Sequence, residues 1–139
     1  MTRSSMNPTS TAFLGYLLLM LALIIVITTY RSVLTLSGKH AANNFKTTGD
    51  DISEFSARLC RAHANCYENF PLFGGILLFA LASGQTAITD GLALTLLGAR
   101  VLQSLTHIIS TSVVAVFARF GFYLVQLVII ALWLYKFLS

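Results

Sequence analysis

The side chains best suited to bind a polar ligand lie between Arg58 and Asn69, where a long apolar segment begins. In a helix, which turns by about 100° per residue, they fall on one stripe about 100° wide. The stripe consists of Arg58, Arg61, Asn65, Glu68 and Asn69. Guanidinium groups hold carboxylates, the Glu68 carboxylate could receive an amino group, and the amides suit backbone-like amides. This inventory favours an anionic, zwitterionic or peptide-like ligand.

A second polar stripe lies in the next apolar segment, in a helix predicted over residues 90–114. Its members are Arg100, Gln103, His107, Ser110 and Thr111, whose spacing again keeps them within about 100°. Charged groups inside a bilayer are costly, and they usually pair or mark a functional site. An Arg100–Glu68 ion pair that only fixes helix packing is one interpretation. The size of the polar set favours the other, a pocket formed by both stripes.

The composition places these stripes in a membrane protein. Of 139 residues, 56% are hydrophobic and 10% are charged, and the mean hydropathy is +0.78; soluble domains carry about 25% charged residues. We expect one all-α domain over residues 1–139, an integral membrane four-helix bundle in a lipid bilayer. Its spans are predicted at about 11–36, 52–83, 90–114 and 117–138. The net charge of +4 is scattered among apolar runs, which argues against nucleic-acid binding.

Local signals place the first two helices. The apolar run from Thr11 is too long for the core of a signal peptide and lacks a small-residue cleavage site, so it is interpreted as a retained span. Residues 37–50, rich in turn formers, make the longest connection. Asp51, with Glu54 three residues later, predicts a capping box for the second helix.

Further signals concern the bend and the remaining connections. Pro71 removes a helical hydrogen bond, so a bend is predicted just below Glu68. Thr89 or Asp90 is predicted to cap the third helix. The third connection is predicted around 114–119, followed by a last helix on which Tyr123 and Gln126 share a face with Arg119.

Basic residues predict the orientation in the membrane. Cytoplasmic loops carry an excess of lysine and arginine. The first and third connections share one side with Arg31, Lys39, Lys46, Arg58, Arg61 and Arg119, whereas the other side has Arg3 and Lys136. Both termini are therefore predicted to be non-cytoplasmic, with the polar site towards the cytoplasm. Arg31 itself has two open interpretations, a side chain that reaches the interface or a site residue.

The two cysteines predict neither a disulfide nor a metal site. Cys60 and Cys66 on one helix would have Cα atoms about 9 Å apart, beyond the reach of a bridge. With His63 they are too few for a metal site of recognisable spacing. His63 lies off the polar stripe and is interpreted as a packing or interhelical hydrogen-bonding residue rather than a catalytic base.

The stretch R-x-x-R-A-H-A-N-C-Y-E-N-F-P-L-F resembles the second-helix signature of the MAPEG superfamily, membrane-associated proteins of eicosanoid and glutathione metabolism. The matching residues are Arg58, Arg61, Ala62, Asn65, Glu68 and Pro71, with the Ala99–Arg100 pair in the third span. Because the chain also has four predicted spans, the resemblance covers essentially its whole length. It implies a homotrimer of four-helix protomers with glutathione bound between neighbouring subunits.

The resemblance also implies roles for individual residues. Glutathione contacts fall on Arg58, Arg61, Asn65 and Glu68. An arginine near the start of the fourth helix, best matched by Arg119, would stabilise the glutathione thiolate as the catalytic residue. Family enzymes often have tyrosines in the third helix that touch glutathione. This chain has Gln103 and His107 in that region instead.

The leading hypothesis is a membrane-bound glutathione-dependent transferase or peroxidase acting on hydrophobic electrophiles or lipid hydroperoxides. The predicted glutathione-binding residues are Arg58, Arg61, Asn65, Glu68, Asn69, Arg100, Gln103 and His107, with Arg119 as catalytic residue. An alternative is a non-catalytic protein that binds lipids or metabolites on the same scaffold. A third hypothesis is a proton or ion pathway over Glu68, His107 and Arg100. The generic apolar residues do not indicate the second substrate.

Overall fold

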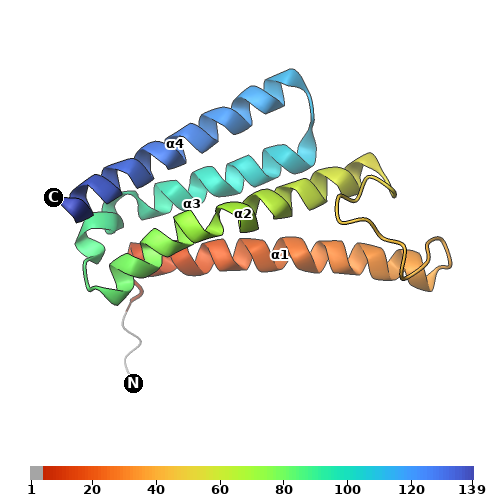
Figure 1. The fold of residues 1–139 in the computed structure, drawn as a ribbon, viewed down its shortest axis with the longest axis horizontal. Coiled ribbons are helices and arrows are strands. Elements are labelled where there is room, and N and C mark those ends of the chain that lie inside the picture. Colours follow the sequence, from red (N-terminus) through yellow and green to blue (C-terminus); the bar gives the residue numbers. More distant parts are fainter. Residues whose placement is uncertain (1–4) are drawn as a thin grey trace.

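The structure, a computed structural model, describes residues 5–139, and in that part it has four helices and no strand (Figure 1). The helices are α1 (Pro8–Leu36), α2 (Glu54–Ala82), α3 (Thr86–Ile109) and α4 (Val113–Leu138). The predicted all-α class is confirmed. Arg3, used above to predict the orientation, lies outside the described residues.

Three of the helices, α1, α3 and α4, are long and apolar enough to cross a membrane, so the protein belongs in a lipid bilayer. Their exposed side chains are large and apolar, as lipid-facing residues should be, for example Leu18 on α1 and Phe117 on α4. α2 has 29 residues, as many as α1, but its polar stripe lowers its hydropathy. The fourth span therefore stays a prediction.

α3 is the central element of the bundle. It packs against α1, α2 and α4, and α1 packs against α2 as well. α4 rests almost entirely on α3; it touches α2 little, and it has no packing contact with α1 within the described chain. In Figure 1, α4 lies against α3 near the C-terminus and separates from it toward the α3–α4 connection. The core of the bundle is built from fully buried side chains, among them Tyr16, Phe73, Leu96 and Trp133.

The start of α2 differs from the prediction. Its N-cap is Ser53, whose hydroxyl oxygen accepts a hydrogen bond from the Ser56 backbone N–H at 3.0 Å. The capping box on Asp51 is therefore wrong. The Asp51 carboxylate is engaged elsewhere, because it accepts from the Lys46 backbone N–H at 3.2 Å and lies 3.3 Å from His40 Nε2.

The start of α3 also differs. The helix begins at Thr86, with Gln85 at the N-cap position and no side-chain cap. Asp90 instead accepts hydrogen bonds from the backbone N–H and the hydroxyl of Thr9, at 3.1 and 2.6 Å. Thr89 lies against the same threonine hydroxyl at 2.6 Å. These two residues join the first turn of α1 to α3, a role that local sequence signals do not show.

The third connection is shorter and earlier than the predicted 114–119. α3 ends at Ile109, Ser110 is extended, and Ser112 caps α4 by accepting from the Ala115 N–H at 3.2 Å. The Ser112 hydroxyl starts the last helix earlier than the apolar run that follows it suggests. As a result, Arg119 lies inside α4 rather than in a connection.

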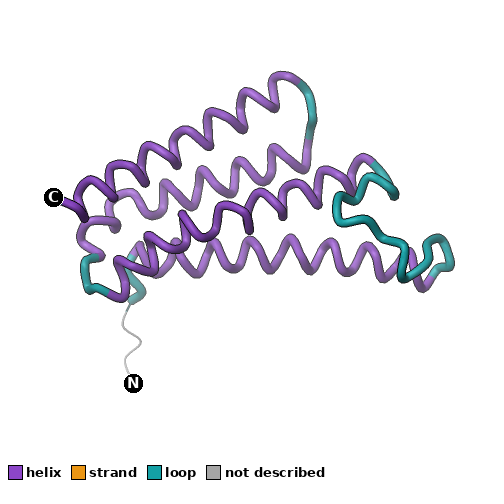
Figure 2. Tube along the Cα trace, viewed as in Figure 1, coloured by secondary structure: helices purple, strands orange, loops and turns teal. Residues whose placement is uncertain are grey.

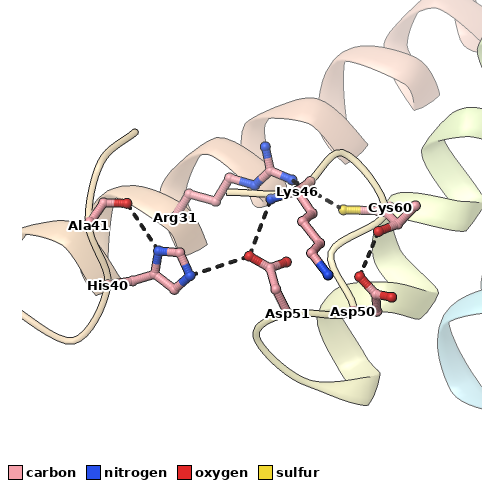
Figure 3. A network of polar contacts seen from close by, with 8 residues as sticks. Arg31, His40, Ala41, Lys46, Asp50, Asp51 and Cys60 are labelled. Carbon is pink, nitrogen blue, oxygen red and sulfur yellow. Dashed lines mark hydrogen bonds and ion pairs between the residues drawn. The ribbon is translucent and has the colours of Figure 1, made fainter. Parts of the chain in front are cut away.

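The long connection between α1 and α2 is held by a polar network (Figure 3). Arg31 Nη2 donates to the Lys46 carbonyl at 2.8 Å, and its guanidinium lies 5.3 Å from the centre of the Phe45 ring. His40 stacks on Phe45 at 4.2 Å and pairs with Asp51. Arg31 thus anchors this loop in the structure.

Both of these connections, residues 37–53 and 110–112, lie at one end of the bundle, and the turn between α2 and α3 lies at the other with the C-terminus (Figure 2). This arrangement agrees with the sequence analysis, which placed the first and third connections on the same side of the membrane. Which end faces the cytoplasm stays a prediction.

Candidate functional site

A groove opens between α2 and α4 above α3, at the end of the bundle that carries the two connections. It consists of two adjoining hollows of about 220 and 250 Å³. Arg61 of α2, His107 of α3 and Arg119 of α4 line both. The groove therefore brings together one predicted site residue from each of three helices.

The outer hollow adds Arg58 and Glu54, both from the first turns of α2. Arg58 Nε donates to the Ile108 carbonyl at 2.8 Å, which joins α2 to the last turn of α3 and leaves the two terminal nitrogens for other partners. Glu54 was predicted only as part of a cap. Its position four residues before Arg58 continues the polar stripe, and that spacing was the signal for including it.

Arg119 is held against the floor of the groove by His107, with 3.0 Å between Nη1 and Nδ1. Because a guanidinium can only donate, the His107 Nδ1 must accept, and the ring is neutral with its proton on Nε2. The predicted catalytic cation is thus positioned by a residue of α3. A cation at this place would favour the ionised form of a nearby thiol.

The inner hollow is lined by Asn65, Gln103 and Tyr123 in addition to the shared residues. Gln103 Nε2 donates to Asn65 Oδ1 at 3.2 Å, and Gln126 Nε2 donates to Gln103 Oε1 at 2.9 Å and to the Phe122 carbonyl at 2.9 Å. Gln126 is completely buried. The sequence placed it on the face of Arg119 but not in the site.

Arg100 lies beneath the groove and lines neither hollow. It is completely buried, its Nη1 donates to Asn65 Oδ1 at 2.5 Å, and its guanidinium lies 4.8 Å from the Phe73 ring and 5.6 Å from the Tyr16 ring. Its Nε and Nη2 have no partner among residues 5–139. The ion pair with Glu68 considered above is not formed within this part of the chain.

Two other predicted residues lie away from the hollows. Asn69 Nδ2 donates to the Asn65 carbonyl at 2.8 Å, and its Oδ1 accepts from the Tyr123 hydroxyl at 3.1 Å, a contact between α2 and α4. Glu68 is exposed and lines neither hollow. No hydrogen bond joins Glu68, His107 and Arg100 within the described residues. The proton-pathway hypothesis therefore has no continuous hydrogen-bonded route in this part of the chain.

The groove thus collects six of the nine predicted site residues. These six are Arg58, Arg61, Asn65, Gln103, His107 and Arg119. Arg100 and Asn69 support it from behind or from the side, and Glu68 lies outside it within one protomer. The two cysteines are free and buried, and Cys66 Sγ contacts Ser104 Oγ at 3.3 Å.

Comparison with protein families agrees with the polar stripe on which the resemblance was based. The profile of the MAPEG family matches residues 9–138, nearly the whole chain, so the protein belongs to the MAPEG family. No curated protein and no solved structure matches the chain.

Proposed function

We propose that this protein binds glutathione in the groove and uses it as co-substrate for a transferase or peroxidase reaction on a hydrophobic substrate. The observation that carries this proposal is the convergence of three guanidinium groups, those of Arg58, Arg61 and Arg119, on one groove between three helices. Three like charges that line one groove repel one another, so an anionic partner bound between them is favourable.

The chemistry of the groove fits glutathione, which carries two carboxylates, an ammonium group, two peptide groups and a thiol. Arg58 and Arg61 offer donors for the carboxylates. The side chain of Asn65 suits a peptide group. The ammonium needs a carboxylate, and within one protomer Glu54 is the acidic residue that lines the groove.

Arg119 would act on the thiol. A guanidinium beside the sulfur favours the thiolate, which is the nucleophile. With an electrophilic substrate the thiolate forms a carbon–sulfur bond, and the electron pair of the broken bond goes to a leaving group or ring oxygen, which takes up a proton. With a lipid hydroperoxide the sulfur attacks the terminal oxygen and the O–O bond breaks, giving the alcohol and a sulfenic acid. A second glutathione converts the sulfenic acid to the disulfide and water.

The second substrate would reach the groove from the bilayer. Val116 and Phe120 line the inner hollow and are themselves exposed on α4. They provide an apolar approach beside Arg119, so that holding the two reactants together would supply much of the rate.

We also propose that the protomers assemble as a homotrimer with each groove completed by a neighbouring subunit. Glu68 supports this proposal, because it belongs to the polar stripe yet faces outward from its own groove. A carboxylate at an intersubunit surface could receive the glutathione ammonium of the adjacent groove. We place the groove toward the cytoplasm, where the basic residues gather.

The test is a titration of the purified protein with glutathione, followed by ultraviolet absorbance of the thiolate and then by a panel of electrophiles and lipid hydroperoxides. Absorbance should rise with glutathione in the wild type, vanish in Arg119→Leu and persist in part in Arg119→Lys. Absence of any glutathione binding would refute the proposal. Glutathione binding without a thiolate, together with tight fatty-acid binding, would favour the non-catalytic alternative.

A further inference from the structure

The hydrogen bonds beneath the inner hollow have a fixed direction. At one end stands Arg100, which can only donate, so the Asn65 side chain must turn its oxygen toward it. Gln103 also donates to this oxygen and must then turn its own oxygen away, toward Gln126. At the other end the Phe122 carbonyl can only accept, which independently requires the amino group of Gln126 at that place.

This direction decides what the groove offers to a ligand. Asn65 Oδ1 already accepts two hydrogen bonds, one from Arg100 and one from Gln103. Asn65 lines the inner hollow, and its Nδ2 makes no hydrogen bond within the described chain. The Asn65 amide therefore presents its N–H donors to a ligand in the inner hollow. A carbonyl or carboxylate oxygen is matched at this point, and an N–H of a ligand is rejected.

We infer that Gln126 is a positioning residue: through Gln103 it holds the Asn65 amide in the orientation that Arg100 requires, and with it the preference of the inner hollow for an acceptor group. It is completely buried and lines neither hollow, so it acts through Gln103 and Asn65 rather than on the ligand. The inference rests on the proposed function for the identity of the ligand, glutathione.

The effect of removing Gln126 follows from the chain of contacts. In Gln126→Leu the buried Gln103 oxygen loses its donor, and an unsatisfied buried acceptor is unfavourable. Gln103 is then no longer held in one amide orientation. If it reverses, its oxygen meets the Asn65 oxygen that Arg100 holds, and the repulsion displaces the Asn65 amide and its N–H donors from their place in the groove. Ligand affinity should fall although no ligand contact has been deleted.

The experiment is a double-mutant cycle on the full-length protein in detergent, with binding of glutathione and of glutarate measured by calorimetry. Asn65→Asp keeps the acceptor for Arg100 and Gln103 but removes the N–H donors. Gln126→Leu and Asn65→Asp should each weaken binding by roughly 10- to 100-fold. The double variant should bind no more weakly than Asn65→Asp alone, because Gln126 acts through Asn65.

Controls separate positioning from stability. Ile129→Ala removes buried packing one turn further along α4 and should lower the melting temperature without changing affinity. If Gln126→Leu does not fold, Gln126→Met takes its place in the cycle. In assays with an electrophile, the effect should appear in KM for glutathione and leave kcat at saturating glutathione unchanged.

Two results would overturn the inference: unchanged affinity in the folded Gln126 variant, or independent losses that multiply in the double variant. A wild type that binds glutarate but not glutathione would refute the proposed function. The role of Gln126 would then be decided by the same double-mutant cycle with glutarate as the ligand. A wild type that binds neither probe would refute both.

Discussion

Arg100 is a buried cation whose surroundings are aromatic rings and one amide oxygen. A charge without a carboxylate in a desolvated place is costly, and apolar groups of similar size often replace such charges without loss of stability. We therefore expect Arg100 to matter for the orientation of the Asn65 amide more than for packing. It holds the oxygen of the amide away from the ligand.

Arg100→Met tests this explanation. We expect the free energy of unfolding to change by less than about 1 kcal/mol or to rise, because an uncompensated buried charge is removed and Gln103 still donates to Asn65. Glutathione affinity should fall. Thermal unfolding and calorimetry measure the two quantities, and a large loss of stability at unchanged affinity would show Arg100 to be structural only.

Tyr123→Phe offers a contrast on the opposite wall of the groove. The lost hydroxyl donates to Asn69 Oδ1, outside both hollows, so the variant should lose about 1 kcal/mol of stability. Glutathione affinity should change by less than about threefold. A loss of affinity comparable with that of Asn65→Asp would instead place the Tyr123 hydroxyl in contact with the ligand.

Spacing along the chain was sufficient to find most of the groove. Arg61, Asn65, Gln103 and His107 follow from helical periodicity, since residues three and four apart share a face. Periodicity does not tell which members of a stripe face the partner helix and which face outward. For that reason Glu68 was grouped with the site residues, although the structure leaves it outside its own groove.

At the scale of the elements, the sequence was sufficient to predict that four helices exist, but it predicted less well where each helix begins and ends. The apolar runs are long and strongly patterned, whereas each end depends on which polar side chain wins a local hydrogen bond. Asp51 and Asp90 are good caps by composition. In the structure both have other partners: Asp51 contacts His40 within the same connection, and Asp90 accepts from Thr9 of α1. Local cap signals report neither contact.

The loop between α1 and α2 should loosen when its network is cut. His40→Ala removes both the stack on Phe45 and the contact with Asp51. Because such a surface contact is worth about 1 kcal/mol or less, tryptic cleavage after Lys39 or Lys46 should accelerate by up to about fivefold. Asp50→Asn, on the neighbouring residue, serves as control. Equal cleavage rates in both variants would show that the His40 contacts do not hold the loop.

At the scale of the whole molecule, the outward position of Glu68 and the inward position of Arg119 lead to a test of assembly. If each site takes Glu68 from one subunit and Arg119 from the next, Glu68→Ala and Arg119→Leu inactivate different halves of a site. Co-expressed, the two variants should form mixed trimers in which some sites are intact.

Activity should therefore reappear in the co-expressed sample, up to a fraction of the wild-type rate set by random mixing. Mixing the separately purified variants without subunit exchange is the control and should stay inactive. No recovery in confirmed mixed trimers would mean that both residues serve the same subunit, or that Glu68 does not serve the site at all.

The dependence of α4 on α3 has a consequence for biosynthesis. α1, α2 and α3 pack on one another, so they can form a unit in the membrane while α4 is still being made. In this order of assembly, we expect α4 to dock last, on the side of α3 that α1 and α2 leave open, which brings Arg119 to His107. The groove is complete only when α4 is in place, because a nascent chain held before Val113 would lack both Arg119 and the part of the core that α4 supplies, including Trp133.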